Sequence, residues 1–275
     1  MGIGATSPLW RRILLRSLAP IYLRRRCATD DGGFEAYVSG AGRLKLLDPR
    51  GLSVEPVHRR FIRDWVEARS IVWDVGAHLG MFALPASLKA KEGRVHAFEP
   101  DRDLAAKLEC SLRLDCNAGL RVSVHALALA DRDGVARFHV SKYSRAMNKL
   151  DKAGPWHAQE FRALETRQTE TARIDTLART LEPPSVLKID VEGAEMRVLE
   201  GGADTIARCR PAILIEGPKE LWAPMGDFFR RCDYVMLDGA AERPVPLDHP
   251  VWDTIAVPRE RYAAGRTAPS PISDI

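Results

Sequence analysis

Four acidic residues of this sequence stand where apolar, strand-like runs end, and that placement can serve chemistry. Asp74 ends "SIVWD", Glu99 follows "GRVHAF", Asp190 follows "SVLKI" and Glu216 follows "PAILI". An acid at the end of a buried strand needs a partner, because an isolated buried charge is costly. Carboxylates gathered at one edge suit a ligand that carries a positive charge or hydroxyl groups.

The stretch "IVWDVGAHLGMFAL", residues 71–84, places a glycine turn directly after the first of these acids. Gly76 permits a tight turn and close backbone approach, and Gly80 lets the next helix pack near the strand. Ala77 and His78 lie within the turn. The pattern is not the dinucleotide fingerprint G-x-G-x-x-G, and Asp74 would repel a pyrophosphate. We therefore expect Asp74 to face a cationic group such as an amino acid's ammonium.

Glu99 lies 99 − 74 = 25 residues after Asp74, at the end of the next strand. An acid at this position can accept hydrogen bonds from both hydroxyls of a ribose. Leu127 and Ala128 follow the third strand, where they would flank an adenine. A nucleoside with an amino-acid arm and no pyrophosphate is S-adenosylmethionine, which we expect as the cofactor.

Asp190 falls beside this expected ligand, and it is the first candidate for a general base. His78 is the second candidate, since histidine titrates near neutrality. Asp190 and Glu216 together either hold a divalent cation or position a substrate. Two carboxylates alone make a weak metal site, so we favour positioning and expect no metal.

Apolar strands alternate with helical segments from residue 54 onward, which predicts an α/β fold with a doubly wound, mostly parallel sheet. Residues 54–68 are helical by the four-residue spacing of Val57, Phe61 and Trp65. The strands "DYVMLDG" and "DTIAVP" should form an antiparallel hairpin at the sheet edge. Further strands are expected at "LRVSVHAL" and "VARFHV", and helices at 80–91, 101–117, 193–207 and 219–232.

Composition excludes several classes of protein. The formal net charge is +4 with no basic stripe among aromatic residues, so no nucleic acid is expected as a partner. The five cysteines form no CxxC pair, and reduced thiols in the cytoplasm are the expectation. No apolar run approaches the ~18 to 20 residues that span a membrane. Oligomeric state is not readable.

The N-terminal residues 1–53 read as an extension of the main domain at 54–258, and 259–275 as a disordered tail. Trp10, Leu14, Leu18 and Ile21 share one helical face among arginines. This helix either packs on the domain or lies on an anionic membrane surface, which would place the protein at the inner face of a membrane. Residues 28–53 predict a short β-hairpin.

Three motifs, "DVGAHLG", "FEP" and above all "LKIDVEGAEMRVLEGG", resemble the FkbM-type family of S-adenosylmethionine-dependent methyltransferases over roughly residues 54–258. The resemblance implies a class I, Rossmann-like fold with a seven-stranded sheet, and O-methylation of a small molecule, sugar or glycan. It also implies that Asp74, Gly76 and Gly80 line the methionine end and that Glu99 binds the ribose. Asp190 would stand near the transferred methyl, and Glu55 of "VEP" is a further cofactor contact.

Two rival functions stay open on the same fold. A nicotinamide-dependent oxidoreductase is disfavoured by Asp74 and by the missing dinucleotide fingerprint. A catalytically inactive binding or scaffold protein is disfavoured by the acids retained at four strand ends.

Overall fold

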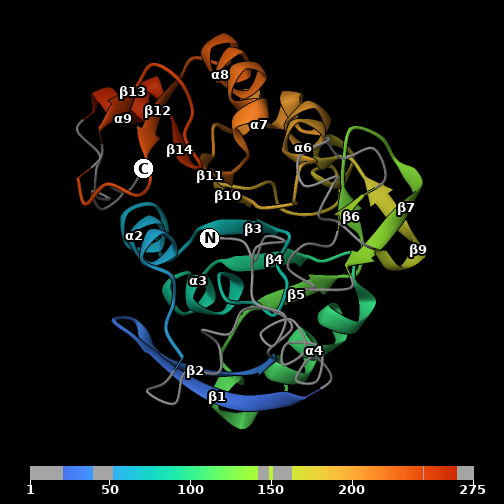
Figure 1. Cartoon of the computed structure of the whole chain (residues 1–275). Helices are drawn as coiled ribbons and strands as arrows, with labels where there is room; N and C mark the ends of the chain where they lie inside the picture. The colour runs from blue at the N-terminus through green and yellow to red at the C-terminus, as the bar shows by residue number, and fades with distance from the viewer. Residues whose placement is uncertain (1–20, 40–51, 142–148, 151–162, 244, 265–275) are drawn as a thin grey trace, which may run out of the picture.

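The computed structural model of this chain describes residues 21–39, 52–141, 149–150, 163–243 and 245–264, and its centre is a mixed β-sheet (Figure 1). The strand order is β13-β12-β14-β11-β10-β3-β4-β5. The run from β11 to β5 is parallel, while β14 pairs antiparallel with both β11 and β12. This confirms the doubly wound fold and the antiparallel hairpin at its edge. The strands are β3 (Ile71–Val75), β4 (Arg94–Phe98), β5 (Val122–His125), β10 (Val186–Ile189), β11 (Ala212–Glu216), β12 (Tyr234–Asp238), β13 (Pro246–Leu247) and β14 (Asp253–Pro258).

The expected seven strands are joined by an eighth, the two-residue β13, which pairs with β12 at the edge. The segment "VARFHV" does not join this sheet as expected. It lies in β7 (Gly134–Ser141), which pairs along its length with β9 (Ala163–Ala172), a strand that the sequence patterns did not indicate. These two form a second sheet with β6 (Ala128–Leu129) and β8 (Lys149–Leu150), in the order β6-β9-β7-β8.

Helices cover both faces of the main sheet (Figure 1). Buried residues of α2 (Pro56–Trp65), α3 (Ala83–Lys89) and α4 (Arg102–Leu112) share one hydrophobic cluster with alternate strand residues. Those of α6 (Glu195–Gly201), α7 (Ala203–Cys209) and α8 (Trp222–Arg231) share a second cluster with the intervening strand residues. Val57, Phe61 and Trp65 are buried, as their spacing predicted.

The helix expected over 193–207 is broken between α6 and α7. At Gly201 a Cβ would lie 2.0 Å from the carbonyl oxygen of Ala130, so the chain approaches β6 more closely than any side chain permits. A Cβ at Gly202 would lie 2.9 Å from Cδ1 of Ile174, which begins the short helix α5 (Ile174–Leu177). A tertiary contact therefore interrupts a segment whose local pattern is helical.

The hairpin near the N-terminus begins earlier than expected, with β1 (Tyr22–Thr29) and β2 (Gly32–Ser39). Asp30 and Asp31 form its turn, and Gly32 adopts a φ of 138°. Residues 40–51, part of the segment expected to form the hairpin, lie outside the described residues. Buried side chains of β2 belong to the same cluster as α3 and α4, so the hairpin packs on the main domain.

Trp10, Leu14 and Leu18 lie outside the described residues, and Ile21 directly precedes β1. Membrane contact and a cytoplasmic location therefore stay predictions. In the described part of the chain, no helix has the length and apolar character needed to cross a bilayer. At the other end, α9 (Arg259–Ala263) occupies the start of the expected tail and is held by an ion pair between Arg259 and Asp233. All five cysteines are free thiols.

Candidate active site

The glycine turn after β3 is fixed by its neighbours on both sides. Gly76 has a φ of +80°, and a Cβ there would lie only 1.8 Å from the carbonyl oxygen of Asp190. The backbone N–H groups of Gly76 and Ala77 both donate to the carbonyl of Phe98, at 3.0 Å each. The turn is thus held between the ends of β10 and β4, and only glycine fits at its first position.

The same turn continues to Gly80 through His78. Gly80 has a φ of +85°, and its missing side chain makes room for Leu108 of α4, whose Cδ1 would lie 2.4 Å from a Cβ. His78 has a left-handed φ of 52°, and its backbone N–H donates to Glu99 Oε2 at 2.8 Å. The fold therefore connects the backbone N–H of His78 to Glu99, the acid that is predicted to bind the ribose.

Glu99 is buried at the end of β4 and accepts two backbone hydrogen bonds. Besides His78, the N–H of Asp101 donates to Oε1 at 2.8 Å. Burial raises the pKa of Glu99 to about 7, although these two hydrogen bonds and the charge of Lys188 favour the ionised form. Glu99 is therefore an acid whose charge changes near neutral pH.

Leu127 and Ala128 reach the same edge after β5. The backbone N–H groups of Leu127 and Glu99 share the carbonyl of His125 as acceptor, at 2.9 and 3.0 Å. Leu127 is half-buried against the cluster beneath α6, and Ala128 is buried in β6. The structure thus places Leu127 beside Glu99, with Ala128 next to it in the chain, where the sequence predicted the adenine.

Lys188 is the residue whose role sequence reasoning missed, although its break in an apolar strand was visible. It stands directly opposite Asp74 in the pairing of β10 with β3. Its Nζ lies 3.2 Å from Asp74 Oδ1 and 3.6 Å from Asp190 Oδ2, and it donates to the Gly76 carbonyl at 3.0 Å. Burial alone would lower the pKa of Lys188, but the carboxylates of Asp74, Asp190 and Glu216 outweigh it and raise the pKa above its usual value.

Asp74 is fully buried, at 0% exposure. Within the described residues neither of its carboxylate oxygens has a hydrogen-bond partner, so the ion pair with Lys188 is what compensates its charge. The positive group that the sequence led us to expect opposite Asp74 is therefore supplied, at least in part, by the chain itself. Direct contact of Asp74 with a cofactor stays a prediction.

Asp190 is the more accessible member of this group, with 26% of its side chain exposed. Its backbone N–H donates to the carbonyl of Val75 at 3.0 Å, which fixes it beside the glycine turn. The turn after Asp190 is shaped by Glu195, whose Oε1 accepts from the N–H of Gly193 at 2.9 Å. Burial raises the pKa of Glu195 to about 7. Asp190 thus offers a carboxylate at the rim on a rigid loop.

A second group of acids surrounds His58, which the sequence reading passed over. Glu55 precedes the first turn of α2, His58 lies one turn later, and Glu216 ends β11. His58 Nε2 is 3.1 Å from Glu216 Oε1, and ligand atoms of all three residues lie within 4.8 Å of one another. A histidine on the buried face of α2, at the spacing of Phe61, Ile62 and Trp65, was the signal that could have revealed it.

Glu55 is therefore placed at the end of β11, two strands away from the glycine turn after β3. Its predicted contact with the cofactor stays a prediction. Glu216 joins Glu55 and His58 in the group that could bind a metal, where the sequence had paired it with Asp190.

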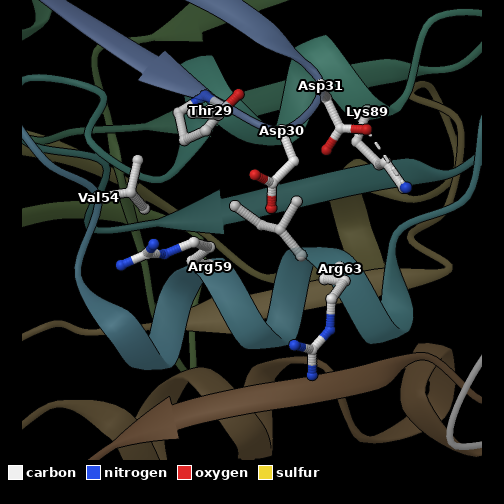
Figure 2. A pocket seen from close by; sticks show the side chains of 9 residues that line it. Thr29, Asp30, Asp31, Val54, Arg59, Arg63 and Lys89 are labelled. Carbon is white, nitrogen blue, oxygen red and sulfur yellow. Dashed lines mark ion pairs between the residues drawn. The ribbon is translucent and has the colours of Figure 1, made fainter.

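A small, solvent-open pocket lies elsewhere, between the β1–β2 turn and helices α2 and α3 (Figure 2). None of the predicted site residues lines it. Its charged groups are Asp30 and Asp31 from the turn, Arg59 and Arg63 from α2, and Lys89 from α3, which pairs with Asp31 at 3.3 Å. The catalytic candidates are instead gathered at the carboxyl ends of the strands, as expected for an open α/β sheet.

Comparisons with known proteins identify the family of the chain. The model of the family described as "Methyltransferase FkbM domain" matches residues 74–236, more than half of the chain. The chain is 33% identical over 172 residues to the 31-O-demethyl-FK506 methyltransferase FkbM of Streptomyces tacrolimicus, over 53% of this chain and 65% of that protein. It is 26% identical over 165 residues to the 2-O-methyltransferase NoeI of Sinorhizobium fredii (strain NBRC 101917 / NGR234), over 56% and 66% respectively.

A crystal structure of a methyltransferase FkbM from Methylobacillus flagellatus KT shares 21% identity and a TM-score of 0.45, over 69% of this chain and 43% of that chain. The chain spans slightly less than two thirds of the length of the two curated relatives that it matches. The match over residues 74–236 shows that the chain belongs to the FkbM methyltransferase family, which confirms the resemblance seen in its motifs.

Proposed function

We propose that this member of the FkbM family transfers a methyl group from S-adenosylmethionine to a hydroxyl oxygen of a small-molecule, sugar or glycan acceptor. The observation that carries the proposal is the meeting of the Gly76 turn, Glu99 and Asp190 at one edge of the sheet. The two curated relatives are named as O-methyltransferases, which supports the reaction type.

The residues present fit the cofactor. Glu99 accepts one backbone N–H at each carboxylate oxygen, and each oxygen keeps acceptor capacity for a ribose hydroxyl. The turn from Gly76 to His78 brings backbone close to the ligand without a side chain at its tightest point. S-adenosylmethionine supplies an electrophilic methyl group; the protein supplies orientation and electrostatics.

Asp190 is the residue we assign to the acceptor. Its carboxylate is partly exposed and stays beside Lys188, so it is suited to accept a hydrogen bond from the acceptor hydroxyl and to take its proton. Aromatic side chains border the end of the neighbouring strand β11. Trp222 donates its indole N–H to the carbonyl of Gly217 and stacks on His249 with ring planes 14° apart, and Trp252 is half-exposed. Such surfaces suit the apolar faces of a sugar or a macrolide-like ring.

Cofactor binding is tested by calorimetric titration with S-adenosylmethionine, with its demethylated product and with NAD. We expect the first two to bind, and Glu99→Gln to weaken them by about 1.5 to 3 kcal/mol, roughly tenfold to a hundredfold. Because the pKa of Glu99 is about 7, wild-type affinity should rise from pH 6 to pH 8, as the carboxylate ionises and accepts the ribose hydroxyls. The variant should lack this rise. Binding of NAD alone would overturn the proposal.

Turnover is tested by transfer of labelled methyl to a panel of hydroxylated acceptors. Asp190→Asn should keep cofactor binding and lose ~10²- to 10⁴-fold in rate, the usual contribution of a general base. The matched control is Asp227→Asn, an exposed acid on α8 that pairs with Arg230 away from the strand ends. An Asp190→Asn variant as active as this control would remove Asp190 from the mechanism.

A further inference from the structure

The group formed by Glu55, His58 and Glu216 has the composition and the spacing of a metal site. One imidazole and two carboxylates converge from the start of α2 and the end of β11, with ligand atoms within 4.8 Å of one another. We propose that these three residues bind a first-row divalent cation such as Mn²⁺ or Zn²⁺. Binding of this cation does not require the methyl-transfer activity.

The distance between the ligand atoms of His58 and Glu216 fits coordination. At metal–ligand bonds of about 2.1 Å, adjacent ligands of an octahedral or tetrahedral ion lie ~3.0 to 3.4 Å apart. His58 Nε2 and Glu216 Oε1 are 3.1 Å apart. The same distance also suits a hydrogen bond, so the ion would replace the proton that these two atoms otherwise share. Three protein ligands leave positions open for water or for an acceptor oxygen.

The setting holds the ligands in place. His58 is 7% exposed, and its ring packs edge-on against Phe82 at 5.4 Å between centroids. Glu216 is 8% exposed at the end of a fully buried strand. Glu55 is half-exposed, which gives an ion a path from solvent. A rigid imidazole beside two carboxylates is the mixed donor set that Mn²⁺ and Zn²⁺ accept.

The surrounding charge also favours a cation. Asp253 stands directly opposite Glu216 in the pairing of β14 with β11. The carboxylates of Glu55, Glu216 and Asp253 therefore gather on one side of the rim, where their negative charges repel one another. A divalent ion would relieve that repulsion.

The test is a titration of chelator-treated protein with Mn²⁺, followed by the loss of the free-ion signal in electron paramagnetic resonance, without S-adenosylmethionine. We expect one equivalent to bind and to raise the melting temperature, since an ion that binds only the folded state stabilises it. Glu55→Gln and Glu216→Gln should each weaken binding at least tenfold. Glu55 makes no side-chain cap hydrogen bond, so its substitution should leave α2 folded.

The matched control is Glu182→Gln. Glu182 is also a carboxylate beside a buried histidine, His96, at 3.3 Å, but it is outside the group. The Glu182→Gln variant should bind Mn²⁺ as the wild type does. Equal weak binding by wild type and all three variants, or no binding at all, would overturn the proposal and leave His58–Glu216 as a hydrogen-bonded pair. Since the readout needs no cofactor, this failure is distinguishable from failure of the methyltransferase proposal.

Discussion

Replacing Lys188 with methionine should destabilise the protein by about 3 to 5 kcal/mol. The attraction between charges 3.2 Å apart is about 5 kcal/mol at an effective dielectric constant of about 20, and the second partner at 3.6 Å adds a similar amount. Desolvation of the buried ions offsets much of this. The loss on substitution arises because Asp74, at 0% exposure, would keep a buried and uncompensated charge.

The assay is urea unfolding followed by circular dichroism, for Lys188→Met, Asp74→Asn and the double variant. Asp74→Asn should cost less, because Lys188 keeps Asp190 and the Gly76 carbonyl as partners. The double variant should be more stable than the sum of the single losses predicts. Lys89→Met is the control, because its ion pair with Asp31 is partly exposed and worth at most ~1 kcal/mol. If Lys188→Met costs no more than this control, or the two losses simply add, the buried ion pair between Asp74 and Lys188 does not stabilise the fold.

Three further predictions follow from single features. Gly76→Ala should unfold at a markedly lower temperature, since its Cβ would meet the Asp190 carbonyl, whereas Gly134→Ala, also at positive φ but with open space, should show only the backbone strain. The pKa of Glu195 is raised to about 7, so its contribution to stability is present below pH 4.5 and is lost as pH rises toward 7. The free energy of unfolding of the wild type, measured in urea, should therefore fall by up to roughly 3 kcal/mol over this pH range, and in Glu195→Gln this fall should be absent. Asp101→Ala should cost about 1 kcal/mol in the same assay, because its side chain caps α4.

The features that the sequence predicted correctly are those carried by local patterns. An apolar run that ends in an acid and a glycine turn marks a strand end wherever the strand lies in the sheet, so Asp74, Glu99, Asp190 and Glu216 were found at the right edge. The helix of residues 56–65 was found because its apolar spacing is unambiguous.

The features that were missed depend on contacts between distant segments. Lys188 meets the turn after β3 across 112 residues, and His58 meets Glu216 across 158. No local pattern carries that information, because strand register decides which residues stand opposite one another. The close packing at Gly201, the last residue of α6, has the same origin, since the Ala130 carbonyl that excludes a side chain there belongs to the segment after β6.

The strand order gives Asp190 its particular position. β10 lies between β3 and β11, so Asp190 stands between the half of the rim that carries the glycine turn and Glu99 and the half that carries Glu216 and Asp253. The first half carries the glycine turn and Glu99, which are expected to hold the nucleoside. The second half carries the carboxylates of Glu216 and Asp253 and the aromatic side chains. A base that removes a proton from an acceptor must reach both the acceptor and the side of the site where the methyl group is held. Among the strand-end acids, Asp190 is the one that the topology places at that boundary, and Lys188 keeps it there.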